Sequence, residues 1–111
     1  MNIEKRDVGE EVAVLRLDGR LNMVAAPRLK EAVDQVVEGG RSRVVVDMAE
    51  VTFMDSSGLG ALIAGLKKAR QRNGDLRISG MNDQVATVLR LTNLDRVLRA
   101  HSSVEAATDG W

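Results

Sequence analysis

The chain has no cysteine, one histidine and two aromatic residues, and these shortages exclude several kinds of site. Without cysteine, disulfides, thiolate catalysis and cysteine-ligated metals are excluded. A single histidine, His101, leaves little material for a zinc site or a histidine-based catalytic centre. Because Phe53 and Trp111 are the only aromatic side chains, we expect no base-stacking surface for single-stranded nucleic acid.

The chain of 111 residues also lacks a charge surplus, a long apolar run and a secretory signal. Its 16 basic and 16 acidic residues cancel, whereas nucleic-acid-binding proteins usually carry a basic surplus. No apolar segment approaches the roughly 20 residues that a membrane-spanning helix needs, and no basic start precedes an apolar core. We therefore expect a soluble, cytoplasmic, monomeric protein of one domain, residues 1–111, with no membrane span and no direct contact with nucleic acid.

The most informative stretch is residues 43–70, in which a valine-rich strand leads directly into an amphipathic helix. The valines at 44–46 form a β-branched run without alternation, which is typical of a strand covered on both faces. The helix is predicted by apolar residues spaced i, i+3, i+4 and i+7: Leu59, Leu62, Ile63 and Leu66.

Between the strand and the helix lies the turn Asp55-Ser56-Ser57-Gly58-Leu59-Gly60. A serine in this turn lies near unpaired backbone N–H groups and the positive end of the helix dipole, which favour a bound phosphate. Phosphorylation there would change the local charge by about −1.5 to −2. Gly58 and Gly60 lack side chains, so a partner protein could approach this first turn closely.

A structural explanation of the same residues stays open at this point. Ser56 or Ser57 would serve as an ordinary N-cap, since serine is favoured there and accepts a hydrogen bond from the backbone N–H of N2 or N3. The two glycines would only let the helix pack tightly on the sheet.

The segments before this stretch predict an antiparallel hairpin and a helix. Residues 1–7 and 11–17 form the two strands, joined by a turn at residues 8–10, and the second strand ends at residues 18–20. Pro27 suits the first turn of the helix that follows. Apolar residues recur along that helix at helical spacing, and Gly39 and Gly40 end it.

The segments after it predict a strand, a helix, a strand and a helix. Leu76 and Ile78 mark a short strand, and Asn82 caps a helix that ends at residues 92–93. Residues 96–99 suggest a final edge strand. Ser102 and Glu105 have capping-box spacing and predict a last short helix. The predicted fold is therefore α/β, in the order β-β-α-β-α-β-α-β-α. It is a mixed sheet with an antiparallel opening hairpin, parallel later strands and helices packed on it.

The segment Phe53-Met54-Asp55-Ser56-Ser57-Gly58-Leu59-Gly60, in its strand–turn–helix context, resembles the signature of the STAS domain. More narrowly, it resembles that of the bacterial anti-sigma factor antagonists. The residues at 19–21 before a helix and Leu91-Thr92-Asn93-Leu94 late in the chain are also similar to the family. The resemblance covers nearly the whole chain and implies a STAS-like single domain.

This resemblance implies a switch protein. In the family, the unphosphorylated form binds a serine kinase that also acts as an anti-sigma factor, and so frees a sigma factor. The kinase phosphorylates the serine directly after the aspartate, here Ser56, and a serine phosphatase restores it. Many antagonists carry an acidic residue where this chain has Asn22, so a charge is lost from the expected kinase surface. The residues expected to contact the partner are Asn22, Asp55, Ser56, Ser57, Gly58, Leu59 and Gly60.

We predict no catalytic residues, cofactor or metal. His101 is the only histidine, there is no Gly-x-Ser-x-Gly elbow, and the dinucleotide and P-loop motifs are incomplete. Asp18, Asp47 and Asp55 lie near predicted strand ends and could bind Mg²⁺ if they converged, but we expect Asp18 and Asp47 to make local hydrogen bonds. The alternative function is a non-switching STAS scaffold or a subunit of a membrane transport system.

Overall fold

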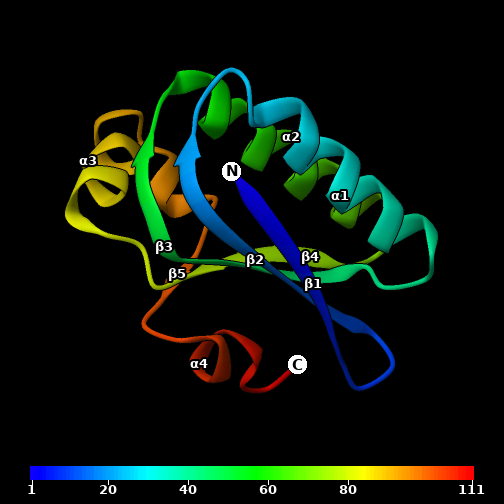
Figure 1. Ribbon diagram of the computed structural model, residues 1–111. Helices are drawn as coiled ribbons and strands as arrows, with labels where there is room; N and C mark the ends of the chain where they lie inside the picture. The colour runs from blue at the N-terminus through cyan, green and yellow to red at the C-terminus, as the bar shows by residue number, and fades with distance from the viewer.

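The computed structural model describes residues 1–111 and contains one five-stranded mixed sheet (Figure 1). The strands lie in the order in which they occur along the chain: β1 (Asn2–Val8), β2 (Val12–Leu21), β3 (Arg43–Met54), β4 (Asp75–Ser79) and β5 (Ala100–His101). β1 pairs with β2 antiparallel, and every later pair is parallel. The predicted α/β fold, its opening hairpin and its element order are confirmed.

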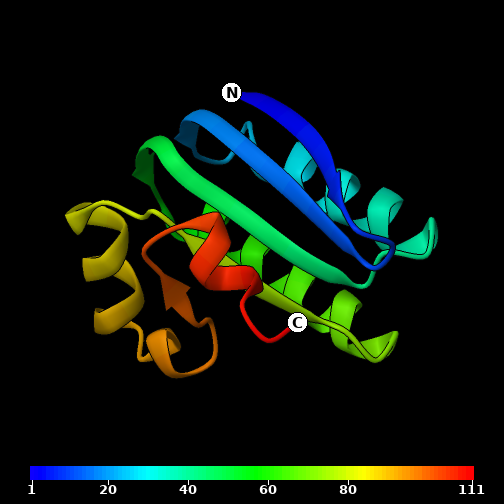
Figure 2. The same ribbon diagram turned by 90° about the horizontal axis from the view of Figure 1, so that it is seen from below.

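The helices lie on both faces of this sheet. They are α1 (Ala26–Glu38), α2 (Ser56–Gln71), α3 (Asp83–Leu91) and α4 (Val104–Thr108), with a 3-10 turn η1 (Leu94–Arg96) after α3. α1 and α2 pack side by side on one face, and α4 lies across the other face, as the second view shows (Figure 2). None of the helices combines the length and the apolar character that crossing a bilayer requires.

The valine run of β3 shows why both faces must be covered. Val44 and Val46 belong to the main core under α1 and α2, whereas Val45 belongs to a smaller cluster with Ala107 of α4. All three valines are fully buried. The prediction of a strand covered on both faces is therefore confirmed. Packing on both faces fixes the position of β3, and the chain passes from its end directly into α2.

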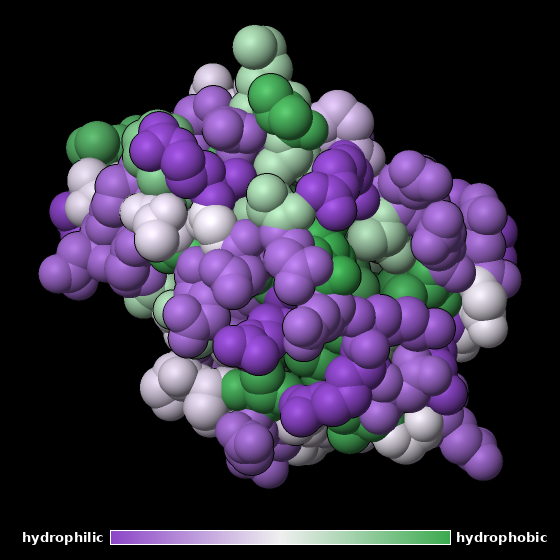
Figure 3. Space-filling model, in the orientation of Figure 1, coloured by the Kyte–Doolittle hydropathy of each residue, from purple (hydrophilic) through white to green (hydrophobic).

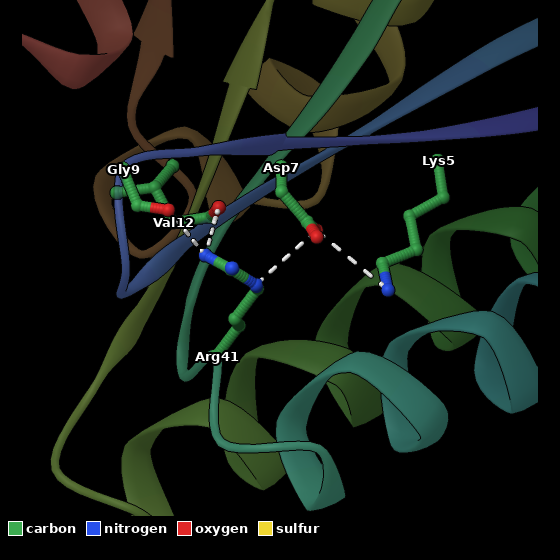
Figure 4. A network of polar contacts seen from close by, with 5 residues as sticks. All are labelled: Lys5, Asp7, Gly9, Val12 and Arg41. Carbon is green, nitrogen blue, oxygen red and sulfur yellow. Dashed lines mark hydrogen bonds and ion pairs between the residues drawn. The ribbon is translucent and has the colours of Figure 1, made fainter.

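An arginine fixes the hairpin at the end of the sheet where β3 begins (Figure 4). Arg41, just before β3, places its Nε 3.2 Å from the Asp7 carboxylate and donates from Nη1 to the Gly9 carbonyl at 2.7 Å. The same Nη1 lies 3.4 Å from the Val12 carbonyl, and Lys5 pairs with Asp7 at 3.6 Å. These contacts hold β1 and β2 at the end opposite to the loops that follow β2 and β3.

Two predicted strand boundaries are wrong. β2 does not end at residues 18–20 but continues to Leu21, because register shifts after Arg16 and Gly19 let the strand bend and remain paired with β3. The last strand is Ala100–His101, not residues 96–99. Residues 94–96 form η1 instead, and Leu98 enters the main core.

The last helix begins one residue later than predicted. Ser103, not Ser102, is the N-cap, and its Oγ accepts a hydrogen bond from the Ala106 N–H at 3.1 Å. Asn82 caps α3 as predicted, since its Oδ1 accepts from the Val85 N–H at 2.9 Å. Asn93 follows α3 in the left-handed conformation, with φ of 59°, as suits the predicted end of the helix at residues 92–93.

Candidate functional site

The candidate site is built where the carboxyl ends of β2 and β3 meet. Because the two strands are parallel, the loop after β2 and the junction between β3 and α2 leave the sheet at the same edge. The Asp55 N–H donates to the Leu21 carbonyl at 3.2 Å, which joins the two segments directly. Gln84 of α3 lies at the same junction. Its side-chain amide accepts a hydrogen bond from the Met54 N–H and donates one to the Met54 carbonyl, each at 2.9 Å.

Asp55 directly precedes α2 and acts as its N-cap. Its Oδ1 accepts from the Gly58 N–H at 2.9 Å, and its backbone carbonyl accepts from the Leu59 N–H at 3.0 Å. The alternative that Ser56 or Ser57 caps the helix is therefore wrong. A carboxylate at this position satisfies an orphan N–H group and complements the helix dipole, so it stabilises the start of α2.

Ser56, the first residue of α2, is exposed, and Ser57 is half-buried. Neither hydroxyl forms a hydrogen bond within the chain. The Asp55 carboxylate accepts a hydrogen bond from the Gly58 N–H. The backbone N–H groups of Ser56 and Ser57 therefore remain the unsatisfied donors of the first turn. A phosphate on Ser56 would therefore lie beside free N–H donors at the positive end of the helix.

The two glycines of the turn have different surroundings. A Cβ on Gly58 would lie 2.3 Å from the Leu21 carbonyl oxygen, so Gly58 allows α2 to pack directly against the end of β2. A Cβ on Gly60 would meet nothing within 4 Å, and Gly60 is exposed. Leu59 is only 6% exposed and belongs to the main core. The surface offered by this turn therefore consists chiefly of Ser56 and Gly60.

Asn22 lies in the loop between β2 and α1, next to Leu21. Its Oδ1 accepts from the N–H groups of Val24 and Ala25, at 3.1 and 3.2 Å, and so shapes the entry to α1. The structure thus brings Asn22, through Leu21, to the same edge as Asp55.

The sequence reasoning missed two apolar residues in this loop. Met23 and Val24 are 72% and 77% exposed, more than almost any other large apolar side chain of the chain. Their position in the sequence could have revealed this exposure, because two large apolar residues lie in a loop that no predicted element covers. They extend the exposed surface away from Ser56 along the β2–α1 loop.

The three aspartates near the strand ends do not form a shared cluster. No group of three or more histidine, aspartate and glutamate side chains is placed to hold a metal ion. Asp47 accepts from the Ala49 N–H at 3.1 Å, the local hydrogen bond expected of it, and Asp55 caps α2. The chemistry available at this edge is therefore that of an exposed hydroxyl on a helix start.

Comparison with known proteins identifies the family. A model of the STAS domain matches residues 3–107. The chain belongs to the STAS domain family. Within it, the chain is 34% identical over 94 residues to the anti-sigma-B factor antagonist of Listeria monocytogenes, covering 83% of this chain and 80% of that protein.

Two solved structures share the fold described above. An anti-sigma factor antagonist from Mycobacterium paratuberculosis superposes with a TM-score of 0.86 at 26% identity, covering 97% of this chain and 91% of that one. The Bacillus cell fate determinant SpoIIAA in its phosphorylated form superposes with a TM-score of 0.76 at 20% identity, covering 97% of both chains. At that identity the second likeness concerns the fold alone.

Proposed function

We propose that this STAS domain is an anti-sigma factor antagonist and that Ser56 is its reversible phosphorylation site. The unphosphorylated form binds a serine kinase that also acts as an anti-sigma factor, and a sigma factor is thereby released. The observation that carries the proposal is the exposed Ser56 hydroxyl, free of hydrogen bonds, on the first turn of α2 beside the open Gly60. The named relative from Listeria supports the class of partner.

In this mechanism the chain is the substrate of the kinase and carries no catalytic group. The hydroxyl of Ser56 needs no rearrangement to be reached, because neither Asp55 nor the backbone holds it. The kinase supplies the nucleotide and the catalytic base, and a serine phosphatase returns Ser56 to its original state. The backbone of Gly60, which has open space where a side chain would lie, lets the partner approach the helix closely.

Phosphate at Ser56 switches binding off through charge and desolvation. It adds about −1.5 to −2 charge beside the Asp55 carboxylate, at a surface that the partner must desolvate. Because Ser56 is exposed and its hydroxyl forms no hydrogen bond within the chain, the fold itself changes little, and the effect is confined to the docking surface. The free N–H groups of Ser56 and Ser57 can receive the phosphate locally.

The test compares Ser56→Ala with Ser56→Asp in binding to each serine kinase/anti-sigma factor of the source organism, by isothermal titration. Ser56→Ala should bind within about twofold of the original chain, and Ser56→Asp should lose at least about tenfold in affinity, ~1.4 kcal/mol. Ser102→Asp is the matched control, because it adds the same charge at an exposed serine outside the expected docking surface, and it should bind within about twofold of the original chain. Equal binding by Ser56→Ala and Ser56→Asp would contradict the switch and favour the non-switching scaffold.

A further inference from the structure

A hollow of about 320 Å³ opens beside the candidate site, between the end of β2 and the start of α1. Its lining residues come from the chain start, β2, the β2–α1 loop and α1: Met1, Arg20, Asn22, Val24, Ala25 and Arg28. The hollow adjoins the Ser56 surface, because Leu21, between Arg20 and Asn22, bonds the Asp55 N–H.

The two charged side chains that line this hollow are both arginines, and both are exposed. Neither guanidinium takes part in an ion pair, whereas Arg16, Arg41 and Arg70 are each paired with a carboxylate. Arg20 lies over the Phe53 ring, 4.6 Å from its centroid, and Arg28 donates to the Met1 carbonyl. Each side chain is thus held in place while most of its N–H donors remain free.

The remaining polar side chain of the hollow offers no competing charge. Asn22 is neutral, and its Oδ1 is occupied by the N–H groups of Val24 and Ala25. Two guanidinium groups therefore face one hollow that has no carboxylate in its lining. This charge is not neutralised within the chain, and it is complementary to an acidic group.

Apolar surface lies directly beside this positive charge. Met23 and Val24 protrude from the same loop, and Val24 also lines the hollow. Figure 3 shows apolar side chains at the upper edge of the molecule, where Figure 1 places the β2–α1 loop, above a largely hydrophilic face. Apolar surface beside charged groups that become desolvated on binding is the arrangement that gives interface contacts their energy.

We infer that this hollow receives an aspartate or glutamate side chain of the protein partner, with Met23 and Val24 packing on apolar surface beside it. The inference rests on the proposed function, so the partner is the serine kinase/anti-sigma factor. A guanidinium presents a planar fork of donors that matches a carboxylate with two parallel hydrogen bonds. A protein side chain fits better than a lipid surface, because the two arginines converge on one hollow that adjoins the Ser56 surface.

The test replaces each arginine and measures affinity for the kinase that binds the original chain, at low and high salt. Arg20→Glu and Arg28→Glu should each weaken binding at least about tenfold and reduce its dependence on salt, since a charged contact has been lost. Arg20→Gln and Arg28→Gln, which remove the charge without reversing it, should weaken binding in the same direction. Lys30→Glu is the matched control, because Lys30 is an exposed cation of α1 outside the hollow, and it should stay within about twofold.

Each outcome has a defined meaning. Binding by all four arginine variants within about twofold of the original chain, with Ser56→Asp still defective, would overturn this inference and leave the proposed function standing. Absence of kinase binding by the original chain would overturn both. Binding of the original chain to phosphatidylglycerol vesicles that Arg28→Glu abolishes, with kinase affinity unchanged, would assign the hollow to a lipid headgroup instead. Thermal melting by circular dichroism confirms that each variant is folded.

Discussion

At the start of α2, two glycines that are separated by one residue have opposite surroundings. A Cβ on Gly58 would lie 2.3 Å from the Leu21 carbonyl oxygen and 2.7 Å from Leu21 Cγ, distances that real Cβ atoms do not show. A Cβ on Gly60 would enter open space. Gly58 therefore joins α2 to β2, and only Gly60 is free to serve a partner.

Replacing these glycines should change the free energy of unfolding in opposite directions. Gly58→Ala should destabilise the fold by about 1–3 kcal/mol, because Leu21 and the start of α2 must move apart. Gly60→Ala should stabilise it by roughly 0.5–1 kcal/mol, because alanine suits a helix interior better than glycine. Urea unfolding measures both, and a Gly58→Ala variant as stable as the original chain would contradict the packing described here.

At the scale of the element, α4 shows how a short helix is held by contacts from far along the chain. Five residues are too few for a stable isolated helix. Ala107 packs in a cluster with the valines of β2 and β3, and Arg77 Nη1 of β4 donates to its carbonyl at 2.7 Å. The Arg77 guanidinium also lies 4.0 Å from the centroid of the Trp111 ring. One β4 side chain thus holds both α4 and the chain end against the sheet.

Arg77→Ala should loosen this segment. The loss of the charged hydrogen bond and of the contact with Trp111 should lower the free energy of unfolding by about 2 kcal/mol. Trp111 is the only tryptophan, so its fluorescence reports the segment directly and should shift to longer wavelength as the ring meets water.

The control for this experiment is Arg70→Ala. Arg70 is 55% exposed and pairs with Asp75 at the surface, so its loss should change the free energy of unfolding by less than about 1 kcal/mol. If Arg77→Ala left both the unfolding curve and the Trp111 emission unchanged, the role given to Arg77 would be wrong.

For the molecule as a whole, periodicity was enough to predict the order of the elements along the chain, and the connections between strands predicted which pairs are parallel or antiparallel. The valine run of β3 and the leucine stripe of α2 each follow from local spacing. What local spacing did not predict depends on contacts across the chain. Asp55 caps α2 in place of either serine, and residues 96–99 do not extend as a strand because η1 forms and Leu98 enters the core.

The candidate site was predicted in part. The signature located Ser56 and both glycines of the turn, and the family resemblance put Asn22 on the same expected partner surface. It did not separate Gly58, which packs against Leu21, from Gly60. Nor did it reveal that Arg20, which is paired in register with Phe53, would stack on that ring and line a hollow with Arg28. Such side-chain encounters arise from the register between strands, and sequence spacing does not contain that register.

We predict that the whole molecule is monomeric at micromolar concentration. One of the two edge strands of the sheet, β1, carries a charged run at residues 4–7, which discourages pairing with a second copy. The other edge strand, β5, is only two residues long. The exposed large apolar side chains of the molecule lie on different elements, apart from the adjacent Met23 and Val24, so they do not form a large apolar patch. Sedimentation equilibrium should give the mass of one chain. A concentration-dependent rise to the mass of two chains would contradict this and would point to self-association.

The central claim is that Ser56 is phosphorylated in the cell, and phosphopeptide mapping of the chain purified from its own cells tests it most directly. Cleavage after Arg43 and Lys67 yields one tryptic peptide that contains both Ser56 and Ser57, so fragment ions must assign the site. We predict phosphate on Ser56 in a fraction of the molecules, changing between growth, stress and stationary phase. Phosphate on Ser57 alone, or none under all three conditions, would contradict the claim.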